Sequence, residues 1–295
     1  MAKTRIEELQ EHTRDLVEAL VTGKLEGGLL ISGSGGVGKS RAVRDALDGL
    51  IAAGQPINVT YLDHVGPLRL YEELEKYKTS GEVLVFEEIE ASLKNEDVLG
   101  ILKSATEGPT HPVTKRKIRT VRWASSIQVK QGLPASFVFE GNIILILNDI
   151  PTGNQSLAAF ETRLFPIPFT VTPADVDAFM RHLVHPRGKT IPYYPNPVTL
   201  TETQCLEVID YLKVTKRSDL RQLDQALSAY LTFPNAWKAK VDLLKQSNLR
   251  LTRGQIRQIA LEINARTDLT PPQKVDAYKD RTGRSQAGYY RDVAA

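Results

Sequence analysis

The residues with the clearest chemical meaning form one glycine-rich segment, GSGGVGKS, at positions 33–40. Its glycines allow consecutive backbone N–H groups to turn toward one anion, and a helix that follows would direct its positive end to the same point. Lys39 adds a positive charge for the β- and γ-phosphates of a nucleotide, and the Ser40 hydroxyl can ligate Mg²⁺. The spacing therefore predicts a nucleotide-binding loop that works with Mg²⁺. The predicted nucleotide-binding residues are Gly33, Ser34, Gly35, Gly36, Val37, Gly38, Lys39 and Ser40.

Two adjacent carboxylates follow the apolar segment Val83–Phe86. Because this segment is typical of a buried strand, we expect Glu87 and Glu88 at the carboxyl edge of a sheet, beside the phosphate loop. Glu87 would hold the hydrated Mg²⁺, and Glu88 would polarise a water for attack on the γ-phosphate. The alternative is a solvated acidic turn, since Glu90 is acidic too. The phosphate loop favours the catalytic interpretation.

The elements that must position these residues are short apolar segments that alternate with helical patterns. This alternation predicts an α/β fold with a parallel sheet covered on both faces. A strand at 165–171 contains prolines and is expected at an edge, because proline cannot donate to a central ladder. After residue 172 we expect helices and no strands. The other expected strands are 29–31, 58–62, 83–86 and 143–147, and the expected helices are 5–21, 39–53, 67–78, 96–106, 173–184, 201–213, 218–231, 236–246, 253–264, 271–281 and 285–293.

These patterns divide the chain into three expected parts. Residues 1–172 form the nucleotide-binding core, 173–247 a helical lid, and 248–295 a small all-α module of three helices. Within the core the alternation breaks near 109–141, where two short segments predict an inserted β-hairpin. The proline-rich stretch 191–197 is interpreted as a connector inside the lid.

Composition limits the classes of protein that this chain can belong to. The chain has 295 residues, of which 41% are hydrophobic and 25% charged, and this is ordinary for a globular protein. The single cysteine, Cys205, excludes an intramolecular disulfide framework and a multi-cysteine zinc site. There is no apolar run of membrane-spanning length, and the charged amino terminus lacks the apolar segment of a signal peptide. We therefore expect no membrane partner and a cytoplasmic location, in the host cytosol if a phage encodes the protein.

The phosphate loop and the acidic pair resemble those of the AAA+ ATPases, the ring-forming branch of the P-loop superfamily. The resemblance covers residues 5–232, and the region 109–141 is similar to AAA+ proteins of phages and mobile elements. It implies a three-layer P-loop core with a helical lid, ATP hydrolysis, and a homo-oligomer in the form of a hexamer-like ring or spiral. The family normally has Asp-Glu where this chain has Glu87 and Glu88. This departure bears on the hydrolysis rate more than on nucleotide binding.

The same resemblance assigns roles to three further residues. Asn148 follows the strand 143–147 and matches the sensor 1 residue that positions the attacking water. Arg163 matches the arginine finger that reaches the nucleotide of a neighbouring subunit, and Arg221 matches the sensor 2 arginine of the lid. The alternative for both arginines is an ordinary surface role. The expected catalytic residues are Glu88, Asn148, Arg163 and Arg221.

Two basic regions suggest a nucleic-acid partner. The insertion carries basic side chains that would suit a phosphate backbone, although such charges also protect the edge of a hairpin from aggregation. The end of the chain is similar to a small helix-turn-helix domain with Arg284 and Arg291 near its second helix, and the alternative is a helical cap with Tyr289 or Tyr290 in its core. The basic residues of the insertion concerned are Lys115, Arg116, Lys117 and Arg119.

The expected function is Mg²⁺-dependent ATP hydrolysis by an oligomer that handles DNA in replication, transposition or another mobile-element process. One alternative is a protein-remodelling ATPase whose terminal module binds a protein partner. A second alternative is a nucleotide-responsive scaffold with little turnover, which the substitution at Glu87 makes conceivable.

Overall fold

A computed structural model describes residues 3–124, 131–148, 150, 155–192, 196–215, 219–247, 253–266, 268–282, 289–290 and 293. The chain divides into two compact units, Met1–Ser228 and Ala229–Ala295. The residues expected to form the lid up to 228 belong to the same unit as the sheet. Within the described helices, none is both long enough and apolar enough to cross a membrane.

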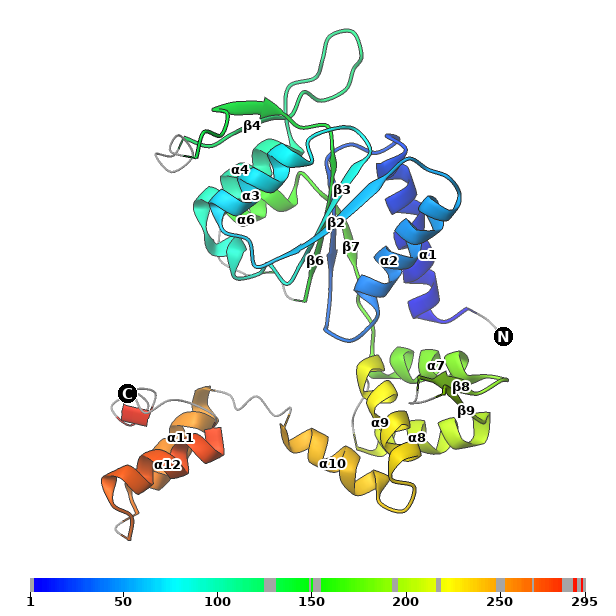
Figure 1. The fold of residues 1–295 in the computed structure, drawn as a ribbon, viewed down its shortest axis with the longest axis vertical. Coiled ribbons are helices and arrows are strands. Elements are labelled where there is room, and N and C mark those ends of the chain that lie inside the picture. Colours follow the sequence, from blue (N-terminus) through cyan, green and yellow to red (C-terminus); the bar gives the residue numbers. More distant parts are fainter. Residues whose placement is uncertain are drawn as a thin grey trace. The chain divides into compact units, whose positions relative to one another are not determined.

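The first unit contains, in the described part of the chain, a five-stranded parallel sheet with the order β2-β3-β6-β1-β7 (Figure 1). The central strands are almost wholly buried apolar runs, as expected for a parallel sheet covered on both faces. The edge position predicted for the proline-containing strand is confirmed. The strands are β1 (Gly28–Ser32), β2 (Asn58–Asp63), β3 (Glu82–Glu87), β6 (Asn142–Leu147) and β7 (Phe165–Pro168).

Helices cover both faces of this sheet and complete three layers (Figure 1). Helices α1 (Arg5–Val21) and α2 (Lys39–Ala52) pack together on one face. The opposite face carries α3 (Pro67–Lys76), α4 (Glu96–Thr106), α6 (Gln155–Glu161) and the 3₁₀ helix η1 (Ser92–Lys94). On that side Phe86 of β3 belongs to a large hydrophobic cluster, with Leu70, Leu102 and Phe160. The α/β expectation is therefore confirmed.

The predicted pair of strands in the insertion is present. β4 (Thr120–Arg122) and β5 (Ser136–Val138) are antiparallel, with Val121 opposite Phe137. The Phe137 ring lies 5.1 Å from the ring of Tyr71, and Trp123 lies 5.8 Å from the same ring. Because Tyr71 belongs to α3, these aromatic contacts fasten the insertion to the core.

The segment after residue 172 contains strands, so the expectation of helices alone is wrong. β8 (Lys189–Ile191) and β9 (Val198–Leu200) form an antiparallel pair on either side of the proline-rich connector. Pro192 and Pro197 disfavour the helical conformation in the residues before them, and the buried side chains of Ile191 and Leu200 pack inward. The helices of this segment are α7 (Pro173–Val184), α8 (Glu202–Val214) and α9 (Leu220–Thr232).

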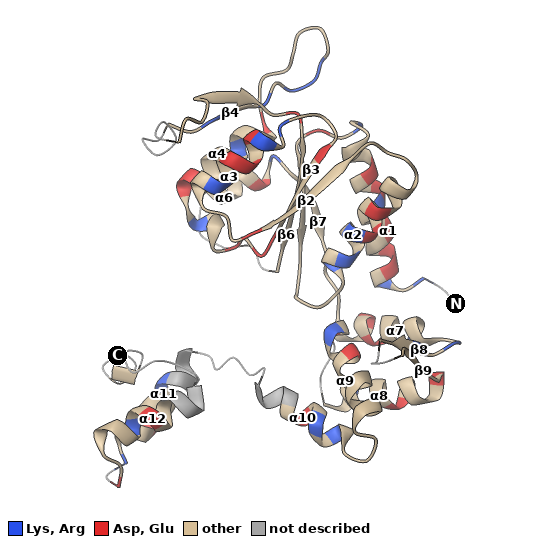
Figure 2. Ribbon diagram, viewed as in Figure 1, with Lys and Arg blue, Asp and Glu red and all other residues tan. Residues whose placement is uncertain are grey.

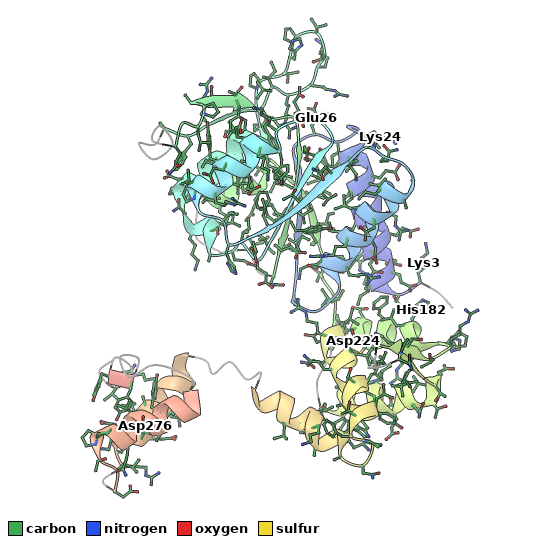
Figure 3. All side chains as sticks on the ribbon, viewed as in Figure 1. Lys3, Lys24, Glu26, His182, Asp224 and Asp276 are labelled. Atoms are coloured by element: carbon green, nitrogen blue, oxygen red, sulfur yellow. The ribbon has the colours of Figure 1, made fainter. Side chains whose placement is uncertain are left out.

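Helix α7 of this segment contacts helix α1 of the sheet domain. Thr4 and Thr172 begin α1 and α7, and each forms a reciprocal capping box with the acidic residue three positions later. The two helices contact each other, and His182 Nε2 of α7 (His182 is labelled in Figure 3) is 2.8 Å from Glu7 Oε1 of α1. The segment after residue 172 is thereby held against α1, on the sheet domain.

The second unit is helical. Its elements are α10 (Trp237–Ser247), α11 (Arg253–Asn264) and α12 (Pro271–Thr282). Tyr289 is buried against Tyr278, with 5.3 Å between the ring centroids, and its hydroxyl donates to Asn264 Oδ1 at 3.3 Å. This contact agrees with the alternative that placed Tyr289 in a helical core. The predicted helix 285–293 falls mostly outside the described residues, and so do Arg284 and Arg291.

We predict that Phe86→Ala lowers the free energy of unfolding by about 3–5 kcal/mol, because the fully buried ring would leave a cavity. Urea denaturation of the whole chain measures this loss. Phe165 is the control, since its side chain on the edge strand β7 is 44% exposed, and Phe165→Ala should cost below about 1 kcal/mol. Equal losses for the two variants would contradict the burial of β3.

Candidate functional site

The phosphate loop connects β1 to α2 at the carboxyl edge of the sheet, as predicted. Gly36 and Gly38 adopt φ angles of 74° and 96°, in the left-handed region that favours glycine. At Gly33 a side chain is excluded by contact, because an added Cβ would lie 2.4 Å from the carbonyl oxygen of Phe169. The backbone conformation therefore requires glycine where the sequence places it.

The ammonium group of Lys39 lies among oxygen acceptors. Lys39 Nζ donates to the carbonyl oxygens of Gly33 and Ser34, each at 2.7 Å, and to Asn148 Oδ1 at 3.1 Å. The pKa of Lys39 is lowered to about 8, mainly by burial and also by the charge of Arg221, while the charge of Glu90 opposes both effects. Two cationic groups therefore meet at one loop, and an anion there would relieve their repulsion.

The acidic pair ends β3, where the sequence predicted it. Glu87 Oε2 accepts a hydrogen bond from Arg44 Nη2 at 3.2 Å. Glu87 Oε1 is buried and has no hydrogen-bond partner among the described residues. A hydrated Mg²⁺ would satisfy this oxygen, so the residues present fit the predicted metal.

Glu88 has a backbone conformation that is unusual for its residue type. Its φ angle is 55°, in the left-handed region, and its side chain is exposed. Non-glycine residues in this region carry a conformational cost, and such residues gather at functional sites. This left-handed conformation turns the chain directly after β3, and its conformational cost agrees with a specific role for Glu88.

Asn148 follows β6, the strand that lies between β1 and β3. Its side chain accepts from Lys39, and its backbone N–H donates to Glu90 Oε1 at 2.7 Å. Glu90 was considered only as part of an acidic turn, yet it contacts Asn148 and influences Lys39. No local sequence signal identifies it, because the contact joins segments 58 positions apart.

The first turn of α9 lies on the phosphate loop. The backbone N–H of Leu220 donates to the Gly36 carbonyl oxygen at 3.1 Å. The Asp219 carboxylate lies against Gly36 and accepts from the backbone N–H of Arg221 at 2.7 Å. Arg221 is therefore brought to the same site as Lys39, where the sequence predicted it. Its role toward a nucleotide stays a prediction.

Arg163 lies elsewhere in the subunit. Its carbonyl oxygen would be 2.8 Å from a Cβ added at Gly27, which directly precedes β1. The phosphate loop follows the other end of β1, a strand of five residues that spans about 16 Å. The guanidinium of Arg163 donates to the carbonyl oxygen of Ala159. Arg163 and the phosphate loop thus lie at opposite edges of one sheet.

The basic residues of the insertion do not share one environment. Figure 2 shows Lys and Arg positions along the loop that leads into β4. Lys115 and Arg116 are exposed, whereas Lys117 Nζ pairs with Glu107 at 2.9 Å. Arg119 is partly buried, lies 5.1 Å from the Phe139 ring centroid and donates to the Ala105 carbonyl oxygen. These contacts favour a packing role for Arg119.

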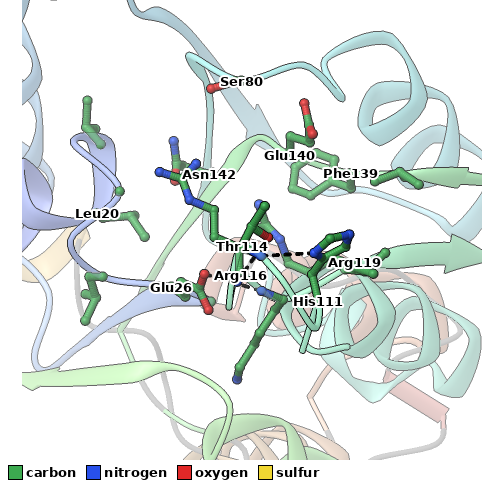
Figure 4. Close-up of a pocket in the computed structure, with 17 residues that line it drawn as sticks. Leu20, Glu26, Ser80, His111, Thr114, Arg116, Arg119, Phe139, Glu140 and Asn142 are labelled. Carbon is green, nitrogen blue, oxygen red and sulfur yellow. Dashed lines mark hydrogen bonds between the residues drawn. The ribbon is translucent and has the colours of Figure 1, made fainter. Parts of the chain in front are cut away.

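A pocket of about 570 Å³ lies beneath this loop (Figure 4). Its lining includes Arg116 and Arg119 from the loop, Glu26, and Asn142 at the start of β6. Gly27 and Asn142 lie at the amino ends of their strands, so this pocket is separate from the phosphate loop.

Comparison with solved structures identifies the fold. The Aeropyrum pernix Orc1 protein, solved in complex with DNA, is similar over 99% of this chain and 82% of its own, with a TM-score of 0.53 and 12% identity. A mutant of Thermotoga maritima RuvB gives a TM-score of 0.49 at 13% identity, over 98% of this chain and 88% of its own. The chain has the fold of the AAA+ P-loop ATPases. No family model matches the chain, and no curated protein matches it.

The burial of Lys39 predicts a dependence of stability on pH. The pKa of Lys39 is about 8 in the folded chain, against 10.5 ordinarily. Below pH 8 the Lys39 side chain is protonated in both the folded and the unfolded chain, so the folded chain bears the full free-energy cost of burying its charge. As the pH rises toward 10.5, the folded chain has lost the proton that the unfolded chain keeps, so stability increases.

We therefore expect the free energy of unfolding of the wild type to rise by about 3 kcal/mol relative to Lys39→Met between these pH values. Denaturant unfolding of both chains over this pH range measures the difference, in which the other titrating groups cancel. A difference that does not change with pH would show that Lys39 is solvated.

Proposed function

We propose that this AAA+ chain is a Mg²⁺-dependent ATP hydrolase that acts on DNA as an oligomer. The observation that carries the proposal is the convergence of Lys39, Asn148 and Arg221 on one glycine loop. These groups come from α2, the end of β6 and the start of α9, and a triphosphate would interact with all of them.

Nucleotide and metal binding are assigned to the loop and the end of β3. The amide groups of 33–40 and the Lys39 ammonium would bind the β- and γ-phosphates, and Ser40 and Glu87 would hold the metal. Bound Mg²⁺ would neutralise charge that develops on these phosphates. Magnesium keeps several waters and takes few protein ligands when phosphates bind it, so two protein ligands suffice.

Hydrolysis is assigned to Glu88 and Asn148. The Glu88 carboxylate would accept a proton from the attacking water, and the Asn148 side chain would orient this water after it exchanges its contact with Lys39. The hydrogen bond from the Asn148 backbone N–H to Glu90 holds the backbone from which the Asn148 side chain extends. Glu90 is thus proposed to position Asn148.

The position of Arg163 supports the proposed oligomer. Since this arginine lies at the edge of the sheet opposite the phosphate loop, it cannot serve the nucleotide of its own subunit. A head-to-tail interface would bring it to the nucleotide of the next subunit and stabilise charge in the transition state. We propose a ring or spiral for this reason.

We predict that Glu88→Gln lowers the steady-state ATPase rate by at least about a hundredfold, because the base is lost while the phosphate contacts remain. Arg163→Ala should lower the rate by about a thousandfold if it acts as the arginine finger. Both variants should still bind ATP.

Mixing the two variants tests whether Arg163 acts between subunits. A mixed oligomer contains interfaces where the Arg163→Ala subunit supplies Glu88 and its neighbour supplies Arg163. An equal mixture should recover up to about a quarter of the wild-type rate, because one ordered interface in four is complete. No recovery would contradict action in trans, and a wild type that binds ATP without turnover would favour the scaffold alternative.

DNA binding is proposed for the exposed part of the insertion. The support is the exposure of Lys115 and Arg116, together with an AAA+ neighbour of the same fold that was solved with DNA. Phosphate contacts of such residues release counterions, so the binding would weaken as salt increases.

We predict that Lys115→Glu combined with Arg116→Glu reduces the salt dependence of DNA binding by about one unit in slope for each lost phosphate contact. Fluorescence anisotropy with single- and double-stranded DNA over a salt series measures the slope. Lys213→Glu on α8 is the control, since this lysine is 65% exposed and lies outside the insertion. An unchanged slope would remove the insertion from the DNA interface, and salt-insensitive binding to a protein alone would favour the remodelling alternative.

A further inference from the structure

Arg44 connects α2 to the acidic end of β3. It lies four residues after Ser40 on α2, so the two side chains leave the same side of the helix. Arg44 Nη2 donates to Glu87 Oε2 at 3.2 Å. The helix that carries the proposed hydroxyl ligand of the metal therefore also binds the proposed carboxylate ligand.

A second contact fixes the orientation of the guanidinium group. Arg44 lies over the ring of Tyr61, with 4.3 Å between the guanidinium carbon and the ring centroid. Tyr61 belongs to β2, which pairs with β3 so that Asp63 is opposite Glu87. A guanidinium that stacks on a ring and binds a carboxylate has little remaining freedom.

The two oxygens of Glu87 have different environments. Oε2 contacts Arg44, while Oε1 is buried without a hydrogen-bond partner among the described residues. Leaving a buried carboxylate oxygen without a partner is costly, which points to a ligand at that oxygen. The alternative is that Arg44 occupies the place of the metal. A guanidinium in that place would be expected to contact both Glu87 oxygens, because guanidinium groups often bind carboxylates through two parallel hydrogen bonds.

We propose that Arg44 is a positioning residue for the metal: it binds Glu87 Oε2 and thereby directs Oε1 toward the Mg²⁺ that Ser40 also ligates. This inference rests on the proposed function of the site. A glutamate has one more rotatable bond than the aspartate usual in this family, and Arg44 restrains that bond before the metal binds. The chain can therefore use glutamate at this position.

The experiment measures the binding of a fluorescent ATP analogue to the full-length chain with Mg²⁺ and with EDTA. The readout is the dissociation constant in EDTA divided by the dissociation constant with Mg²⁺. This ratio reports the metal's contribution to binding and does not require turnover. We expect Arg44→Ala to reduce this ratio about tenfold, as is usual when a group that orients a metal ligand is removed. Binding in EDTA should change little, and Arg44→Lys should restore part of the ratio.

Arg41→Ala is the matched control. Arg41 has the same charge on the same helix, but it pairs with Asp45 at 2.7 Å and not with Glu87. This variant should keep the wild-type ratio. Arg44 has a side chain that is 47% exposed, so its replacement should leave the chain folded, and thermal unfolding verifies this. If Arg44→Ala is destabilised, the same ratio measured with Arg44→Gln decides.

The outcomes separate this inference from the proposed function. A ratio for Arg44→Ala equal to or above that of the wild type would overturn the positioning role, although the wild type binds Mg²⁺ and ATP. An equal reduction in Arg41→Ala would also overturn it, since helix charge alone would then be responsible. If the wild type binds no nucleotide under either condition, the proposed function fails and the inference fails with it.

Discussion

The burial of one positive charge determines how the first unit is built at its carboxyl edge. An ammonium group that leaves water needs several oxygen acceptors, and Lys39 finds them in two loop carbonyls and the side chain of Asn148. These acceptors belong to the turn after β1 and to the end of β6, so the loop can surround Lys39 only when the two strands are paired. The start of α9 closes the same loop through Gly36. The proposed nucleotide chemistry therefore depends on an assembled sheet and not on the glycine segment alone.

The parallel sheet also separates two sets of polar groups. The phosphate loop, the acidic pair and Asn148 follow the carboxyl ends of β1, β3 and β6. Arg163 and the pocket beneath the insertion lie at the amino ends. Because one subunit cannot bring its two edges together, a transition-state arginine from the amino edge has to come from another copy. The proposed oligomer rests on Arg163 acting as such an arginine.

Glu87 is held by residues outside its own strand. Its longer side chain has more freedom than aspartate, and Arg44 and Tyr61 reduce that freedom through an ion pair and a ring contact. These contacts come from α2 and β2, which are not adjacent in the chain to β3. We propose that these residues let a glutamate take the place of the aspartate expected at this position.

Much of the architecture could be predicted from the sequence, because periodicity, capping residues and the positions of glycine and proline act over a few neighbouring residues. The phosphate loop, the central strands, α1 and α7, and the edge position of β7 follow from such local signals. The pair β8–β9 was missed, since its strands are three residues long and flank prolines that are also typical of a connector. Contacts between distant segments decided the rest: Glu90 at Asn148, Arg44 at Glu87, and Arg119 over Phe139. Residue types and spacing carry no information about these pairs, because only the packing of the sheet and its helices brings them together.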